Sequence, residues 1–204
     1  FDVISEASQE IISEEVDNIS NNTENNIVKN SETVVQEEDN NGIPSDIELN
    51  NLVLMELDNG GIVLIEMYPD KAPWHIYRIR LLVANNFYDG LSFFRAVKNF
   101  MVQTGDPTNT GSGGSKFGRI QAEINDIKHV RGIVSMARGQ DIDSADSQFF
   151  ICFDDAGFLD GQYTVFGQVI SGMEYVDMIK KGQGANGEVR DPDEIISMKV
   201  IADI

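Results

Sequence analysis

The residues best suited to chemistry lie in one short stretch, FFRAVKNFMVQTGD, at positions 93–106. Within it Arg95 supplies a guanidinium, Met101 an apolar surface and Gln103 an amide. On an extended segment, side chains of equal parity share a face, so these three can point into a common cleft. A hydrogen bond from a charged donor is stronger than a neutral one. The stretch therefore indicates a cleft in which a cationic donor faces an apolar floor.

Short antiparallel strands must position this stretch. Residues 51–57 and 61–68 are β-rich runs, and the Asn59-Gly60 pair between them is typical of a hairpin. Pro73 begins an expected helix, because apolar residues follow it at helical spacing. The elements predicted after the hairpin are a helix at about 73–86, strands at about 92–97, 100–105, 132–136, 148–152 and 164–170, a helix at about 172–181, and a strand at about 194–202. Many strands with few helices predict a β-barrel or sandwich with helical plugs.

Several separated motifs, in one order along the chain, resemble the cyclophilins, which are peptidyl-prolyl cis-trans isomerases. The motifs are 93–106, VRGIVSMARG at 130–139, SQFFICF at 147–153 and FLDGQYTVFGQVISGME at 158–174. The sequences of these motifs are similar to those of bacterial, especially exported, members. The resemblance covers essentially all of residues 50–204 and implies a mainly β fold, an eight-stranded antiparallel β-barrel capped by two α-helices. It also implies an enzyme that assists protein folding and requires no metal and no cofactor.

The reaction that this resemblance implies is rotation about Xaa-Pro peptide bonds. The barrier is about 18–20 kcal/mol, because amide resonance must be broken as the bond twists. In the twisted amide the proline nitrogen is pyramidal with a free lone pair, so a donor aimed at it stabilises the transition state selectively. We expect Arg95 to be that donor, with Gln103 holding Arg95 or the substrate carbonyl. One charge-assisted hydrogen bond of about 1.5–3 kcal/mol would supply about one to two decades of rate.

The substrate-binding residues are likewise implied by the resemblance. Those expected to form the apolar socket for the proline ring are Phe100, Met101, Phe150 and Leu159. Ala137 and Arg138 match the segment whose backbone pairs with the peptide, and Gln148 lies in the next motif. The alternative for the apolar residues is plain barrel core, which is the usual fate of such side chains.

Three positions depart from the family's usual pattern. Phe94 stands where histidine usually precedes the arginine, Phe158 where many eukaryotic members have Trp, and Tyr163 where they have His. Phe158 removes an indole N–H donor from the rim of the pocket. We therefore expect weak cyclosporin binding and retained isomerase activity.

Charge divides the chain into two parts. Residues 1–45 hold eleven Asp or Glu against Lys29 alone, which is −10 of the total −19, and they are rich in Asn and Ser. Such a segment cannot close a core, so we expect a disordered acidic tail at 1–45 before an isomerase domain at 46–204. Because no basic stripe is available, nucleic acid and anionic membrane surfaces are poor partners.

Other residues with chemical potential have plainer interpretations. Cys152, the single cysteine, lies in an apolar run and is expected to be a buried, inert thiol. His75 and His129 lie far apart in the sequence without ligands at metal spacing, so we expect no metal site. Residues 111–116 lack the spacing of a phosphate loop and are expected at the rim of the substrate groove. Residues 141–146 lack the glycine and glutamate of a calcium loop and are expected to form a solvated turn.

The first residue and the apolar runs bear on the compartment of the protein. The chain begins with Phe1 rather than Met, so we expect either a processed product or a fragment of a longer gene product. A cleaved export signal would explain the missing Met and would place the protein in the periplasm or cell envelope; the alternative is the cytoplasm. No apolar run approaches the ~20 residues of a membrane span. We expect a monomer acting on proline-containing, unfolded or newly exported polypeptides. A binding module in which turnover is incidental, and a tail that tethers the domain, remain alternatives.

Overall fold

The computed structural model describes residues 49–184 and 186–204. The predicted tail at 1–45 and its boundary at residue 46 lie outside these residues. The strands are β1 (Leu52–Leu57), β2 (Ile62–Met67), β3 (Arg95–Val97), β4 (Met101–Thr104), β5 (Ile133–Met136), β6 (Phe149–Cys152), β7 (Val165–Ser171) and β8 (Ile195–Val200). The helices are α2 (Pro73–Ala84) and α3 (Met173–Met178), with short 3-10 turns η1 (Leu49–Asn51), η2 (Gly157–Leu159) and η3 (Ile201–Asp203).

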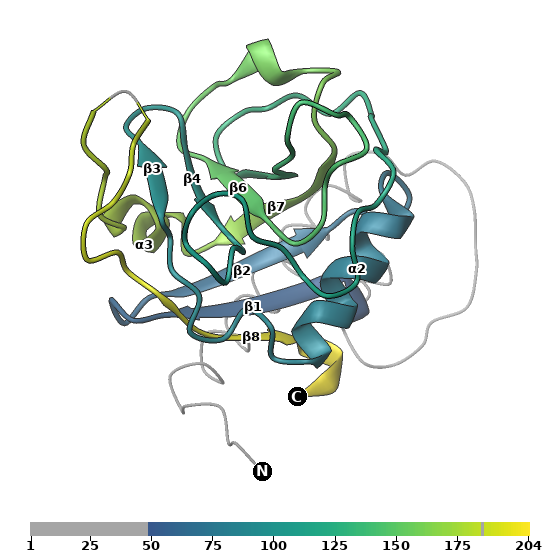
Figure 1. The fold of residues 1–204 in the computed structure, drawn as a ribbon. Helices are drawn as coiled ribbons and strands as arrows, with labels where there is room; N and C mark the ends of the chain where they lie inside the picture. Colours follow the sequence, from purple (N-terminus) through teal and green to yellow (C-terminus); the bar gives the residue numbers. More distant parts are fainter. Residues whose placement is uncertain (1–48, 185) are drawn as a thin grey trace, which may run out of the picture. The chain divides into compact units, whose positions relative to one another are not determined.

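The strands form one antiparallel sheet in the order β3-β4-β6-β5-β7-β2-β1-β8 (Figure 1). The predicted hairpin is confirmed, with Gly60 at φ 84° and the amide of Gly61 bonded to Asn59 Oδ1 at 2.9 Å. Just outside the two edge strands, Ser92 and Glu194 form a β-bridge that brings the edges together. The sheet is therefore a curled half-barrel, and the predicted mainly β fold with eight antiparallel strands and two helices is confirmed.

Helix α2 covers the core with one of its faces. Ile76, Ile79 and Val83, at spacings of three and four, are buried, whereas Trp74 and Tyr77 are exposed. Pro73 stands at the first helical position, where its missing N–H costs no hydrogen bond. The predicted helix is thus confirmed, with its end at residue 84 rather than 86. Among the described residues, we find no helix with the length and apolar character required to span a membrane.

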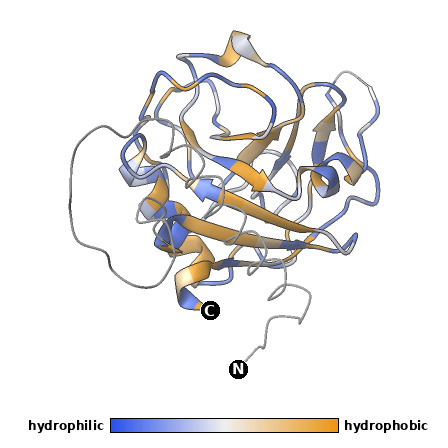
Figure 2. Ribbon diagram, turned by 180° about the vertical axis from the view of Figure 1, so that it is seen from behind, coloured by the Kyte–Doolittle hydropathy of each residue, from blue (hydrophilic) through white to orange (hydrophobic). Residues whose placement is uncertain are grey.

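Strand β6 is buried on both faces, which explains its continuous apolar run, and β4 and β5 are largely buried as well. Val102 and Ile151 belong to the large core inside the half-barrel, whereas their neighbours Met101, Phe150 and Cys152 belong to a second apolar cluster. Alternate residues of a strand point to opposite faces, so one strand serves both clusters. Figure 2 shows the hydrophobic residues concentrated on the strands and on one side of the helices. The second cluster is the foundation of the site described next.

Candidate active site

Arg95 and Gln103 face each other across the β3–β4 pair. They are register partners, and Arg95 Nη1 donates to Gln103 Oε1 at 3.0 Å. The same nitrogen lies 3.9 Å from Met101 Sδ, and Arg95 Nε donates to the carbonyl of Asn186 at 2.9 Å. The structure thus brings together Arg95, Met101 and Gln103, as their equal parity predicted.

The positive charge of the Arg95 guanidinium is not neutralised by a carboxylate among the described residues. In residues 49–184 and 186–204 it forms no ion pair with a carboxylate, and its Nη2 makes no hydrogen bond. Burial lowers its pKa from the ordinary value, an effect that nearby Tyr163 opposes. An arginine remains protonated under such a shift. A bound group would therefore meet a half-buried cationic donor with free N–H groups.

A cavity of about 100 Å³ opens beside this guanidinium. Nine of the eleven residues predicted for the site line it: Arg95, Phe100, Met101, Gln103, Ala137, Arg138, Phe150, Leu159 and Tyr163. Strands β3, β4 and β6 supply four of them, and η2 supplies Leu159. We call the apolar part of this cavity, formed by Phe100, Met101, Phe150 and Leu159, the socket.

Aromatic contacts fix the far side of the socket. The rings of Phe150 and Tyr163 are 5.8 Å apart and edge to face, and the guanidinium of Arg138 lies 4.6 Å from the Tyr163 centroid. Behind Phe150, the ring of His129 stacks at 6.1 Å and contacts Asp160 through Nδ1 and Ser135 Oγ through Nε2, both at 3.1 Å. These geometries are favourable for aromatic and cation–π pairs. His129 therefore supports the socket from within the fold.

The two remaining predicted residues lie outside the small cavity. Phe158 is 66% exposed, and its ring centroid lies 5.2 Å from that of Phe100, so it forms the rim. Gln148 accepts from Gln103 Nε2 at 2.8 Å and donates to the carbonyl of Gly113 at 2.7 Å. A chain of side chains thus links Arg95 through Gln103 and Gln148 to the glycine-rich loop.

That loop bounds a second, larger cavity of about 440 Å³. Gln103, Ala137 and Arg138 line both cavities, so the two adjoin, and we call them together the groove. The larger one is also lined by 111–115, which agrees with the predicted place of this loop at the groove rim. We call residues 106–118, which run along this side of the larger cavity, the wall. The groove suits an extended chain with one ring in the socket.

Residues 52–200 match the family model described as cyclophilin type peptidyl-prolyl cis-trans isomerase/CLD. The chain belongs to the cyclophilin family. It is 46% identical over 165 residues to a probable peptidyl-prolyl cis-trans isomerase of Brucella suis, covering 75% of this chain and 84% of that protein. It is 42% identical over 125 residues to the human peptidyl-prolyl cis-trans isomerase-like 3, covering 59% and 77%.

Solved cyclophilins share the fold. A Cryptosporidium parvum cyclophilin, crystallised in the presence of the dipeptide Ala-Pro, superimposes with a TM-score of 0.68 at 29% identity, covering 73% of this chain and 98% of that one. Cyclophilin AquaCyp293 of Hirschia baltica gives 0.70 at 24% identity, covering 83% of each chain. The predicted family and isomerase activity are confirmed, so this cyclophilin is an enzyme that interconverts cis and trans Xaa-Pro bonds.

Buried carboxylates hold the wall in this cyclophilin. Asp106, fully buried, accepts from the amides of Thr108, Thr110, Gly111 and Gly113 at 2.6–3.1 Å. Burial alone would raise its pKa, but these hydrogen bonds lower it below the ordinary value. A Cβ on Gly113 would lie 2.0 Å from Asp106 Oδ1, so only glycine fits there. One charged side chain thus determines the path of about eight backbone residues.

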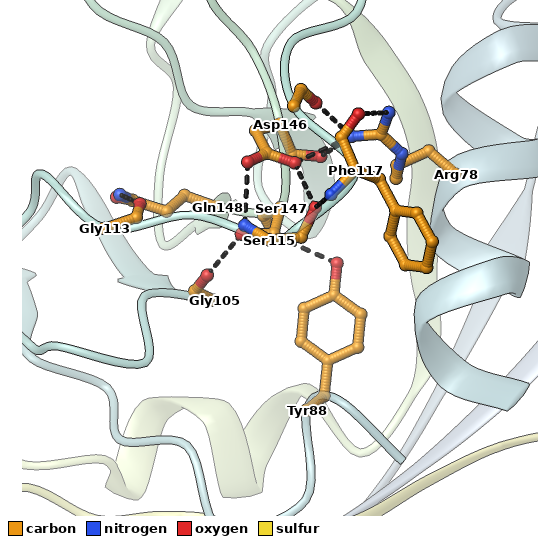
Figure 3. Close-up of polar contacts among 10 residues, drawn as sticks. Arg78, Tyr88, Gly105, Gly113, Ser115, Phe117, Asp146, Ser147 and Gln148 are labelled. Atoms are coloured by element: carbon orange, nitrogen blue, oxygen red, sulfur yellow. Dashed lines mark hydrogen bonds and ion pairs between the residues drawn. The ribbon is translucent and has the colours of Figure 1, made fainter. Parts of the chain in front are cut away.

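Asp146 lies in the groove and not in the solvated turn that was predicted for it. The predicted solvated turn holds for residues 141–143, which are exposed, but it is wrong for Asp146, which lines the larger cavity and pairs with buried Arg78 (Figure 3). Arg119, Gly139 and Ser144 also line that cavity and were not predicted. Asp146 lies two residues before Gln148, and both line the larger cavity. That closeness to a predicted site residue was the one signal that could have placed Asp146 in the groove.

The remaining candidate residues are structural. Cys152 is buried under the socket, and burial, with a smaller effect of Asp160, raises its pKa to about 12, so the thiol is neutral and unreactive. His75 Nδ1 contacts Glu123 at 2.6 Å where α2 begins. In the described part of the chain, no three His, Cys, Asp or Glu side chains are grouped to hold a metal ion.

Proposed function

We propose that Arg95 is the catalytic donor of this isomerase and that the socket holds the substrate proline. The single observation that carries the proposal is the guanidinium of Arg95, fixed by Gln103 and Asn186 at the mouth of the small cavity, without a carboxylate partner among the described residues. A fixed donor needs no reorganisation as the amide twists, so its free N–H groups favour the pyramidal nitrogen. Gln103 orients the guanidinium through its amide oxygen.

The rest of the substrate then has a defined place. The proline ring enters the socket between Phe100, Met101, Phe150 and Leu159, with Tyr163 closing one side. The peptide backbone runs along Ala137 and Arg138, which line both cavities, and past Gln148. The ring is immobilised by apolar contact while the preceding residue rotates, which converts binding energy into a lower barrier.

A protease-coupled isomerisation assay on a short Xaa-Pro peptide tests this assignment. We expect Arg95→Ala, at matched folded concentration, to lower kcat/KM by about ten- to a hundredfold, because one charge-assisted hydrogen bond to the transition state is lost. The matched control is Arg131→Ala, whose guanidinium pairs with Asp177 on the surface and lines neither cavity. Arg95→Ala with activity within twofold of the wild type would refute the role of Arg95.

We propose that cyclosporin binds this cyclophilin weakly, although the family binds it in general. The support is Phe158, a rim residue that offers no N–H donor. We expect Phe158→Trp to tighten cyclosporin binding in a fluorescence titration and to leave the isomerase activity of the socket within a fewfold of the wild type. Equal affinities for the two proteins would contradict the proposal.

We propose that the clients are proline-containing segments of unfolded or newly exported polypeptides, met as a monomer in the periplasm or cell envelope. The support for this compartment is the similarity of the motifs to exported bacterial members, and the alternative is the cytoplasm. Fractionation of the source cells, followed by protease treatment of intact spheroplasts, distinguishes the two compartments. Light scattering after gel filtration tests the monomer.

A further inference from the structure

Three consecutive residues, Asp146, Ser147 and Gln148, each hold a different part of the groove (Figure 3). Asp146 binds the wall and helix α2, and Gln148 binds Gly113 and Gln103. Between them Ser147 points the other way, donating to the carbonyl of Gly105 at 2.7 Å while its own carbonyl accepts from Tyr88 at 2.9 Å. The chain bends at Asp146 and Ser147, and Asp146 and Gln148 both line the larger cavity, so these two side chains face the groove together.

The link from this segment to α2 is a largely buried ion pair. Arg78 Nη1 lies 2.7 Å from Asp146 Oδ1, and only 9% and 17% of the two side chains are exposed. The same nitrogen donates to the carbonyl of Gly118 at 2.6 Å. Because a buried charge without a partner is costly, Arg78 and Asp146 must stay together, and Gly118 with them.

The other carboxylate oxygen of Asp146 accepts a hydrogen bond from the wall. Oδ2 accepts from the amide of Ser115 at 2.7 Å, and Ser115 Oγ donates to Oδ1 at 2.5 Å and accepts from the amide of Phe117 at 3.1 Å. A Cβ on Gly114 would lie 2.3 Å from Asp146 Oδ2, so the backbone approaches the carboxylate as closely as glycine allows. The stretch contains no strand that could hold it in place instead.

We propose that Arg78 and Asp146 are positioning residues for peptide binding: their ion pair fixes residues 114–118 of the wall and so determines the affinity for peptides that extend past the proline. The inference rests on the proposed use of the groove for the peptide, but it does not depend on Arg95 as the donor. Arg78 lines neither cavity, and therefore acts only through Asp146 and the wall.

The test separates KM from kcat with two substrates, a minimal Xaa-Pro dipeptide amide and a longer peptide with the same Xaa-Pro bond. We expect Asp146→Asn to raise KM for the longer peptide by about three- to tenfold, to change KM for the dipeptide amide less than twofold, and to leave kcat within twofold. Ser115→Ala keeps the ion pair but loses both Oγ bonds, and should raise KM for the longer peptide by a smaller factor. Arg131→Met, which removes an exposed ion pair with Asp177, should change neither KM.

A double variant separates the effect of the ion pair on peptide binding from its effect on the stability of the fold. Asp146→Asn leaves Arg78 buried and uncompensated, whereas Arg78→Met with Asp146→Leu removes both charges and should recover unfolding midpoints. We expect KM for the longer peptide to stay raised in the double variant. The proposal is overturned if that KM recovers together with stability, if both substrates are affected equally, or if kcat falls while both KM values hold. If Arg95→Ala keeps its activity in the same assays, the proposed role of Arg95 fails, whereas the positioning proposal is still decided by the two KM values of the Asp146 variants.

Discussion

The socket and the wall bound the same groove but are built by different means. Met101 and Phe150 of the socket stand on strands, where ladder hydrogen bonds fix the backbone and apolar packing covers both faces of the sheet. The wall, residues 106–118, contains no strand, and the carboxylates of Asp106 and Asp146 accept its amides instead. Buried acceptors can therefore replace a ladder where the chain must curve around a polar cavity.

The largest effect that we expect comes from a substitution that disrupts the socket. Phe150→Ala should lower the free energy of unfolding by about 3–5 kcal/mol, because a buried ring packed between His129 and Tyr163 is replaced by a void. Urea denaturation measures the loss. The control, Phe158→Ala, removes a largely exposed ring and should cost less than about 0.5 kcal/mol. Similar losses for the two variants would show that Phe150 is not part of a packed socket.

A second variant breaks the wall and spares the socket. Gly113→Ala places a Cβ against Asp106 and Thr108 and should cost about 1–3 kcal/mol. Amide hydrogen exchange should speed up at Gly111 and stay unchanged in β6. Gly157→Ala is the matched control, since its nearest neighbour, Asp160 Oδ2, would lie at an ordinary 3.8 Å. Faster exchange spread evenly over β6 would contradict the separation of the two regions.

A third variant tests where the two regions meet. Gln103→Leu removes both the acceptor for Arg95 and the donor to Gln148, so we expect kcat/KM to fall about three- to tenfold, the equivalent of one ordinary hydrogen bond. Gln168→Leu is the control, because Gln168 accepts from Tyr68 away from both cavities. A similar loss in both variants would mean that Gln103 has no special link to Arg95.

Lowering the pH should affect the socket before the wall, and these are the smallest effects that we expect. Burial lowers the pKa of His129, against the opposing effect of Asp160, so the neutral ring is favoured on folding and its stabilisation is lost as pH falls below the ordinary 6.5. The pKa of Asp106 is also lowered, and its stabilisation is lost only below the ordinary 3.8. As the pH is lowered from 7, NMR spectra should therefore shift behind Phe150 before they shift at Gly111 and Gly113. The reverse order would contradict the assignment.

The sequence predicted the socket far better than the wall. The parity of Arg95, Met101 and Gln103, and the apolar run around Phe150, are local patterns that a strand converts directly into a shared face. The bond between Arg78 and Asp146 joins residues 68 positions apart through a polar contact that has no periodicity. A solvated turn was the natural interpretation of Asp146, because only the fold shows that Arg78 lies opposite.

The position of the last strand has a consequence for synthesis. Strand β8 pairs with β1, and the chain between them is about 140 residues long. At about 5–20 residues per second, a ribosome needs roughly 7–28 seconds to bridge that interval. During this time the β1–β2 hairpin lacks its outer neighbour and presents an open, strongly apolar edge. We therefore expect this isomerase to depend on chaperones while it is being made.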